Sequence, residues 1–301
     1  MTSKTANWEF SEELFEEYKK KSQIAEVWRR LKKSKTAMLG LFVLTTIILL
    51  ALFADLIRNY QSMAIEQNIM NRLQSPNSTH WFGTDAQGRD LFARVIHGAR
   101  ISLLLGFSCT AISVFVGLIL GSVAGYFGGK IDGVIMRILD SIMSIPAILL
   151  SLAIVAVLGQ SIPNLIIAMT VAYVPGFARI VRASVLTVIG NEYIEAAKAS
   201  GLGTFRIISK YVLPNAFGPI IVEITMSVAS VIKAVAGLSF IGLGIIPPTP
   251  EWGAMLSESR EFMRYNPYLV LYPGLAIVLT SLSLNLLGDG LRDALDPRLK
   301  D

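Results

Sequence analysis

The sequence has little of the chemistry on which soluble enzymes and secreted domains depend. Its 301 residues include one cysteine, two histidines and only 16% charged residues. A single cysteine excludes a disulfide framework within the chain. Because Cys109 lies inside an apolar run, we interpret it as a core residue and not as a reactive thiol. With 53% hydrophobic residues, the composition lies outside the range of soluble globular domains and indicates an integral membrane protein.

Enzyme motifs are also lacking. The segment "GYFGGKI" resembles a phosphate-binding loop, but Ala124 stands at the first glycine position and Ile131 replaces the serine or threonine. In "GLSFI", Ile241 replaces the second glycine of a nucleophile elbow. We therefore expect no catalytic residue and no cofactor bound by this chain. In a membrane protein the net charge of +5 predicts orientation, not nucleic-acid binding.

The two histidines are the candidate metal ligands. His80 and His97 are 17 positions apart in a segment that should lie outside the membrane. A metal site is one interpretation, and a pair of solvated loop histidines is the commoner one. We expect no metal ion.

The apolar runs are long enough for six membrane-spanning helices, since a helix needs about 20 mainly apolar residues to cross the hydrocarbon core. The candidate crossings lie at residues 37–54, 101–129, two between 140 and 179 that the turn-forming segment "GQSIPN" separates, 216–245 and 267–287. The predicted fold class is an all-α integral membrane protein with both termini on one side.

The distribution of Lys and Arg predicts which side. With the N-terminus inside, 19 of the 27 Lys and Arg residues lie in cytoplasmic segments, seven lie outside and one, Lys233, lies within a helix. Short loops rich in Lys and Arg stay cytoplasmic. We therefore expect a cytoplasmic arm (1–36), a first crossing (37–57), an extracytoplasmic loop (58–100), a five-helix core (101–288) with a cytoplasmic loop (183–215), and a cytoplasmic tail (289–301).

The N-terminal arm is amphipathic between residues 11 and 35. Ile24, Val27, Trp28 and Leu31 recur at helical spacing, with acidic residues before them and basic residues after them. We expect this helix to lie along the inner membrane face, either as an anchor on anionic lipid or as a docking helix for a partner.

Four glycines at a spacing of four mark the second crossing: Gly117, Gly121, Gly125 and Gly129. A stripe of small residues lets two helix backbones approach closely. The stripe predicts tight packing and leaves open whether the neighbour belongs to this chain or to another subunit.

A soluble-looking segment, "NEYIEAAKASGLGTFRIISKYVLP", interrupts the apolar runs in the predicted loop 183–215. Asn191 can cap a first helix, Gly201 and Gly203 permit a bend, and a second helix should continue until Pro214 stops it. The expected apolar face of this helix–bend–helix unit consists of Leu186, Ile189, Tyr193 and Ala197.

The same segment resembles the EAA loop of ABC importer permeases, which docks in a groove of the ATP-hydrolysing subunit. Tyr211 replaces an isoleucine of that pattern. The residues that match it, and to which the resemblance assigns the ATPase-coupling role, are Glu195, Ala196, Ala197, Gly201, Leu213 and Pro214.

Further segments resemble one branch of this family, the dipeptide, oligopeptide and nickel permeases. They are "HWFGTDAQGRDLFARVIHGARISL", "GYFGGKIDGVIMRILDSIMSIPAILL", "LSFIGLGIIPPTPEWGAML" and "NLLGDGLRDALDPRLK". The arm and residues 60–79 show no resemblance of use.

The resemblance implies an importer in a prokaryotic cell membrane. An extracytoplasmic binding protein would deliver the substrate, this chain and a homologous permease would form a heterodimeric channel, and two ABC ATPases would consume ATP and Mg²⁺. The cargo stays open among dipeptides, longer peptides, glutathione, haem and chelated nickel. A stand-alone secondary transporter or channel and a membrane scaffold are the alternatives outside the family.

The fifth crossing departs from the family pattern. It reads Val235-Ala236-Gly237-Leu238-Ser239-Phe240 where the family often has Glu-Ala before Leu-Ser-Phe, and Lys233 stands where an apolar residue is usual. We take Lys233, Val235 and Ser239 as candidates for the translocation pathway.

Lys233 should lie about 25 Å along its helix from the cytoplasmic start, in the outer part of the membrane. There it either faces a cavity, where it could attract a substrate carboxylate, or snorkels to the interface. Glu223, nearer the inside, is expected to pair with a basic residue of the loop.

Overall fold

The structure is a computed structural model that describes residues 23–295. Within that range it is helical, apart from loops and one isolated β-bridge between Thr84 and Asp90. The arm up to residue 22, the side chain of Ile24 and the tail from residue 296 lie outside the described residues, so the expectations for them stay predictions.

Five helices are long and apolar enough to cross a membrane. They are α3 (Lys35–Leu52), α5 (Leu91–Phe127), α8 (Ile162–Val188), α11 (Leu213–Phe240) and α13 (Tyr268–Leu295). A sixth crossing results when α6 (Gly129–Met143) and α7 (Ala147–Leu158), which are bent by 81° relative to each other, are counted as one span. The all-α fold is thus confirmed for the described residues, with five apolar spans, or six if the bent pair is one span.

Two crossings begin earlier than predicted. α5 starts at Leu91 and not at residue 101, because Asp90 caps it by accepting a hydrogen bond from the amide of Ala93 at 2.7 Å. Its first turns carry Arg94 and His97, which are buried in protein, so hydropathy alone places the start too late. α6 likewise starts at Gly129 and not at residue 140.

The start of α6 is difficult to predict because it carries acidic residues. These residues form ion pairs with arginines of α8. Asp132 accepts two hydrogen bonds from Arg182, both of 2.5 Å, and Asp140 accepts one of 2.6 Å from Arg179. The span then breaks between α6 and α7, at Pro146, as expected for a residue that lacks an amide hydrogen.

The predicted glycine stripe joins α5 to α8. Gly117, Gly121 and Gly125 all face α8, and a Cβ atom on Gly121 would lie 2.7 Å from the Cβ of Val181. Such distances leave room for hydrogen alone, so the stripe allows close backbone contact. The neighbour is therefore a helix of the same chain.

Gly129 does not belong to this stripe, which corrects the sequence-based assignment. α5 ends at Phe127, and Gly129 begins α6 with a φ of +53° and no atom within 4 Å of a Cβ built on it. Gly129 continues the spacing of four along the chain, but α5 has already ended at that point.

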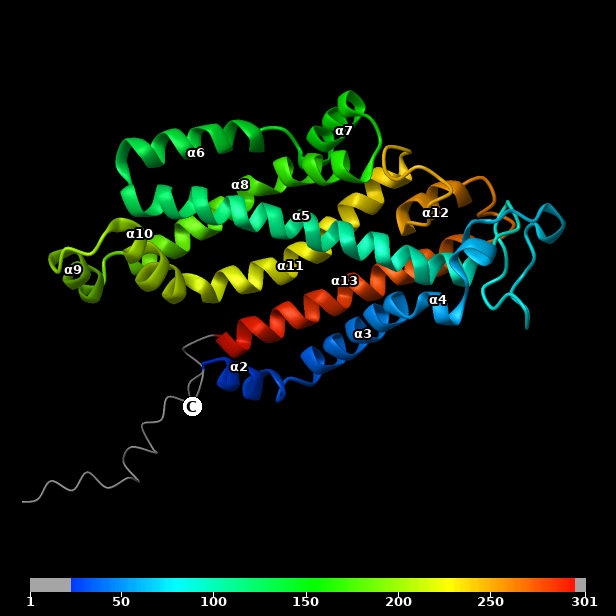
Figure 1. The fold of residues 1–301 in the computed structure, drawn as a ribbon, viewed down its shortest axis with the longest axis horizontal. Helices are drawn as coiled ribbons and strands as arrows, with labels where there is room; N and C mark the ends of the chain where they lie inside the picture. Colours follow the sequence, from blue (N-terminus) through cyan, green and yellow to red (C-terminus); the bar gives the residue numbers. More distant parts are fainter. Residues whose placement is uncertain (1–22, 296–301) are drawn as a thin grey trace, which may run out of the picture.

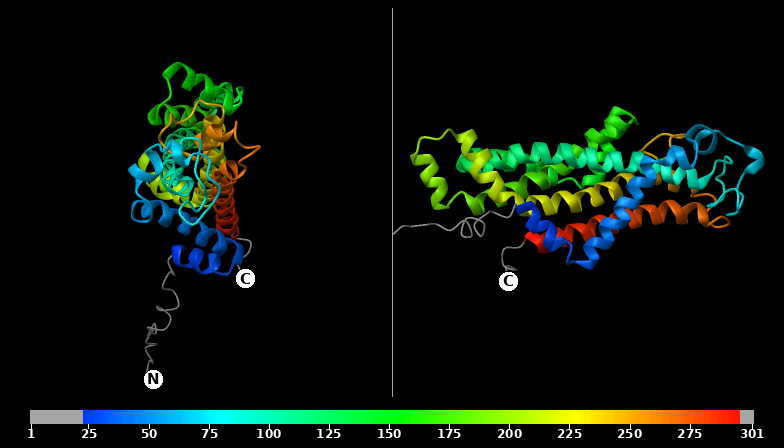
Figure 2. Two further views of the ribbon diagram at one scale, coloured as in Figure 1. Left: turned by 90° about the vertical axis from the view of Figure 1, so that its right-hand side faces the viewer. Right: turned by 60° about the horizontal axis from the view of Figure 1, so that its bottom comes forward.

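The helices form an elongated bundle with two distinct ends (Figure 1). At the α9 end lie α9 (Glu192–Ala199) and α10 (Thr204–Ile207); at the α12 end lie α4 (Ala54–Ile57), the loop 58–90 with its short turns Tyr60–Ile65 and Ile69–Asn71, and α12 (Trp252–Ser259). α3 and α13 form one edge of the bundle, and α6 lies on the opposite edge (Figure 2). α2 (Gln23–Leu31) packs on α13, where Leu31 lies over Gly290.

Candidate functional site

The α9 end carries the helix–bend–helix unit that the sequence predicts. α9 ends in two hydrogen bonds, from the amide of Gly201 to the carbonyl of Lys198 (3.0 Å) and from that of Leu202 to Ala197 (3.3 Å). These are the two bonds of a Schellman motif, which requires a left-handed residue at its turn. Gly201 supplies that residue with a φ of +74°. The bend is therefore built into the sequence at this position.

The buried side of the unit differs from the predicted face. Ile194, Ala197 and Ile207 are buried against the end of α8, whereas Leu186 and Tyr193 are exposed. The prediction extended one helical period from α8 through α9, but residues 189–191 separate the two helices and reset the phase. Of the predicted four residues, Ala197 alone is buried in this cluster.

The open side of the unit carries Glu195 and Ala196 from α9 and Phe205 from α10. The ring of Phe205 is 84% exposed, next to the exposed basic residues Arg206 and Lys210. Asn191 occupies the cap position of α9, but its side chain makes no capping bond and instead donates to the hydroxyl of Tyr193 at 3.4 Å.

The end of the loop runs into α11 without a stop. A short π-helical segment (Ile208–Val212) leads directly into α11, and Pro214 lies in the first turn of that helix. The prediction that Pro214 ends a helix is therefore wrong: a proline is tolerated in a first turn, where an amide hydrogen has no partner to lose. Leu213, half-buried, begins α11.

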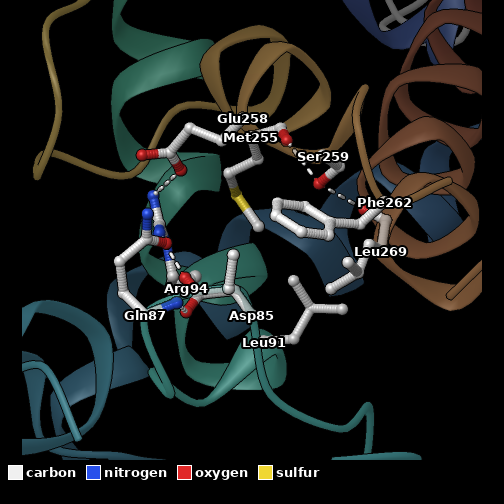
Figure 3. Close-up of a pocket in the computed structure, with 10 residues that line it drawn as sticks. Asp85, Gln87, Leu91, Arg94, Met255, Glu258, Ser259, Phe262 and Leu269 are labelled. Atoms are coloured by element: carbon white, nitrogen blue, oxygen red, sulfur yellow. Dashed lines mark hydrogen bonds and ion pairs between the residues drawn. The ribbon is translucent and has the colours of Figure 1, made fainter. Parts of the chain in front are cut away.

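The α12 end holds a largely buried cluster of four charges, from the loop 58–90, α5 and α12. Figure 3 shows three of them, Asp85, Arg94 and Glu258. One oxygen of Asp85 accepts hydrogen bonds from Arg89 (2.6 Å) and Arg94 (2.5 Å). Glu258 pairs with Arg94 at 2.8 Å and with Arg89 at 3.2 Å. Two positive and two negative charges balance, which a buried ionic group requires. Burial raises the pKa values of Asp85 and Glu258, and Arg94 opposes both shifts.

Another buried carboxylate precedes α12 directly. Glu251 accepts hydrogen bonds from the amides of Gly253 (2.9 Å) and Ala254 (2.8 Å) and from the hydroxyl of Ser102 in α5 (3.1 Å). Trp252 adds a bond from its indole nitrogen to the carbonyl of Val95, at 3.0 Å. Burial raises the pKa of Glu251, while the hydrogen bonds from Gly253, Ala254 and Ser102 lower it. Glu251 thus fastens α12 to α5.

The histidines have structural partners. Nδ1 of His80 lies 2.8 Å from a carboxylate oxygen of Asp90, and Nε2 of His97 lies 2.8 Å from the carbonyl oxygen of Arg58. In the part of the chain that the structure describes, no three His, Cys, Asp or Glu residues are grouped to hold a metal ion.

The three pathway candidates do not share a surface. Lys233 is exposed, whereas Val235 and Ser239 are 1% and 3% exposed inside the chain. Glu223 accepts a hydrogen bond from Ser227 at 2.8 Å and forms no ion pair with a described residue of the loop, contrary to the expectation.

The sequence reasoning missed the charged cluster and the exposed Phe205. The signal for the cluster was the run of alternating charges in "GTDAQGRDLFAR" ahead of an apolar stretch. It indicates charges that need partners but does not say that one partner lies on α12.

Comparisons with known proteins identify the family of this chain. Residues 117–301 match the family described as binding-protein-dependent transport system inner membrane component. Residues 22–76 match the N-terminal TM domain of oligopeptide transport permease C. The match includes the end of the arm and most of residues 60–79, where the sequence motifs show no resemblance of use.

Two relatives extend over nearly the whole chain. The dipeptide transport system permease protein DppC of Alkalihalophilus pseudofirmus is 47% identical over 95% of this chain and 93% of its own length. The glutathione transport system permease protein GsiD of Pectobacterium atrosepticum is 42% identical over 91% of each chain.

Among solved structures, the fold resembles the MetNI methionine ABC transporter in an inward-facing conformation, with a TM-score of 0.56 and 20% identity over 67% of this chain and 96% of that chain. This likeness concerns the fold alone. The family match, the named relatives and the apolar helices identify a multi-pass inner-membrane protein. The chain belongs to the binding-protein-dependent transport system inner membrane components, the permease subunits of ABC importers.

Proposed function

We propose that this chain is one of two homologous permease subunits that form the translocation pathway of an ATP-driven importer for dipeptides or oligopeptides. The observation that carries the substrate class is the 47% identity, over nearly the whole of both chains, to a permease named for dipeptide transport. A relative from Pseudomonas aeruginosa, 40% identical, is named for di- and tripeptides.

The α9–α10 unit is the proposed contact with an ABC ATPase. Glu195 and Ala196 are exposed together with the ring of Phe205 and the cation of Arg206. Aromatic and arginine side chains carry most of the binding energy at protein interfaces, and the small Ala196 permits close approach of a partner. Two such ATPases would bind ATP and Mg²⁺, and this chain would transmit their movement through α11.

We infer that the α9 end faces the cytoplasm and the α12 end the outside. The α9 end holds the basic residues of the loop, among them Lys198, Arg206 and Lys210, as expected for the cytoplasmic side. The last turn of α13 and α2 lie toward that end, which agrees with cytoplasmic termini. An extracytoplasmic binding protein would then approach the α12 end.

Glutathione is the second candidate substrate, because two relatives of 42% and 44% identity are named as glutathione permeases. Uptake of a labelled dipeptide and of labelled glutathione by the complete importer in proteoliposomes, each with its loaded binding protein, distinguishes the two.

The coupling role is tested by reversing the charge of Glu195. In the purified complex, Glu195→Lys should abolish most of the ATPase stimulation by loaded binding protein, while subunit stoichiometry stays unchanged. Asp289→Lys, an equivalent change at an exposed residue of α13 outside the loop, is the control and should retain stimulation. Unaltered stimulation in Glu195→Lys would exclude Glu195 from the contact. Substrate flux by the purified chain alone would overturn the whole proposal.

A further inference from the structure

α11 is the most enclosed of the spanning helices, with half of its most apolar window buried inside the chain. Between Pro219 and Phe240, a stretch that the structure describes in full, Lys233 is the one exposed residue. The helix therefore leaves a narrow open strip, and the residue that projects most from it carries a positive charge.

The composition of this strip differs from that of the lipid-facing helices. The open faces of α3, α5 and α13 carry many large apolar side chains, such as Phe42, Phe115 and Val278. The strip on α11 instead has half-buried Ser230 and Gly237 on either side of Lys233 in the helical period. A surface of this kind is suited to a polar pathway and not to acyl chains.

Helices of the same chain contact this face of α11 on the turns before and after Lys233. Toward the α12 end, the side chain of Ile148 in α7 comes within 3.8 Å of the position of a Cβ on Gly237. Toward the α9 end, Met226 lies against Gly288 of α13. The strip around Lys233 thus lies between a contact with α7 and a contact with α13.

Lys233 has no ionic partner among the described residues. The nearest acidic residue along α11 is Glu223, ten positions and about 15 Å away, beyond the reach of a lysine side chain. Its carboxylate already accepts a hydrogen bond from Ser227. The ammonium group is therefore available to a ligand that brings its own negative charge.

We propose that Lys233 recognises the carboxylate of a peptide as it passes this strip of α11. The inference rests on the proposed function, since each dipeptide carries a free terminal carboxylate. A charge-assisted hydrogen bond from an ammonium group to a carboxylate is short and about twice as strong as a neutral one. A dipeptide spans at most about 7 Å, roughly half of the distance between Lys233 and Glu223 along the helix, and the contact that we assign to Lys233 is the one with the carboxylate.

The test uses the complete importer in proteoliposomes, supplied with saturating loaded binding protein, and compares a free dipeptide with an amidated form that the wild-type importer also carries. Because all variants work with the same binding protein, its preference cancels in the ratio of variant to wild-type rates. Lys233→Met should lower uptake of the free dipeptide about tenfold and leave uptake of the amide unchanged. Lys233→Arg, which keeps the charge, should retain uptake of both.

Lys130→Met removes the same charge from an exposed residue at the start of α6 and is the matched control; it should leave both rates unchanged. The proposal is overturned if Lys233→Met carries the free dipeptide at the wild-type rate, as a lysine that snorkels to the interface requires. It is also overturned if the free and the amidated peptide lose uptake equally, which indicates a structural role. Failure of the proposed function is separate, because the wild-type importer would then carry neither peptide.

Discussion

Arg94 and Glu258 form a 2.8 Å ion pair that joins the first turn of α5 to the last turn of α12. Asp85 bonds to the other terminal nitrogen of the same guanidinium at 2.5 Å, so one arginine holds a loop and a helix that are far apart in sequence. The side chain of Arg94 is 1% exposed, so it makes both contacts inside the protein. The α12 end is therefore fixed as one unit.

Arg94→Met should destabilise the protein strongly. The substitution keeps most of the side-chain volume but leaves two buried carboxylates with Arg89 as their remaining cation. Removing one partner from a buried ion pair costs about 3–5 kcal/mol, because the other charge stays buried without compensation. The measurement is thermal unfolding of the purified complex in detergent.

Asp55→Asn is the control for that experiment. Asp55 also pairs with an arginine, Arg100, at 2.7 Å, but both side chains are exposed to solvent. Exposed pairs of this kind contribute little. We expect no measurable change in the unfolding temperature, and an equal loss in both variants would mean that burial does not set the strength of the cluster.

Glu251 should make stability depend on pH. Burial raises its folded-state pKa above the ordinary value of 4.5, so the folded protein binds this proton more tightly than the unfolded chain. The resulting stabilisation is fully present below pH 4.5 and is lost as the pH rises through the raised pKa. Glu251→Gln, which does not titrate, should lack this component.

The measurement is the difference in unfolding temperature between wild type and Glu251→Gln across the acidic range. A constant offset is expected from the capping bonds to Gly253 and Ala254, which the amide replaces imperfectly. On top of it, the difference should shift in favour of the wild type as the pH falls toward 4.5. A difference that does not vary with pH contradicts the assignment.

The number and order of the crossings could be predicted from the sequence, because lipid-facing helices need long apolar runs and these runs are local. The start of α5 could not, since Arg94 and His97 look like loop residues until their partners are known. The ion pairs between α6 and α8 had the same effect on the third crossing. In each case a charge inside the bundle is compensated by a residue that the local sequence does not contain.

The candidate site also has parts that the sequence could predict and parts that it could not. Gly201 could be placed at the bend because a left-handed turn after a helix has a local signature. Val235 and Ser239 are pathway candidates because their segment departs from the family pattern, but an α-helix turns by about 100° per residue, so both point away from Lys233 and are buried. The exposure of Phe205 depends on how α10 packs, which no periodicity over four residues defines.

Gly121→Ala should loosen the contact between α5 and α8. The added Cβ would lie 2.7 Å from the Cβ of Val181, a distance that forces the two backbones apart. Overpacking in a well-packed interior costs about 1–3 kcal/mol. Gly133→Ala in α6 is the control, since no atom lies within 4 Å of a Cβ at that position. The unfolding temperature should fall in Gly121→Ala and be kept or rise in Gly133→Ala; equal behaviour would mean that the stripe is not a packing contact.

Gly201→Ala should uncouple ATP hydrolysis from transport without unfolding the protein. Open space surrounds this position, so the added methyl group meets no neighbour, but a φ of +74° is strained for alanine. The strain costs about 1 kcal/mol or more and favours conformations in which α9 and α10 no longer meet at the same angle. Gly203→Ala is the matched control. Gly203 lies in the same loop and a Cβ there also meets no atom within 4 Å, but its φ of −64° is one that alanine adopts without strain. Substrate uptake per ATP hydrolysed should fall in Gly201→Ala and stay near the wild-type value in Gly203→Ala, and the proposed coupling geometry is wrong if the two variants behave alike.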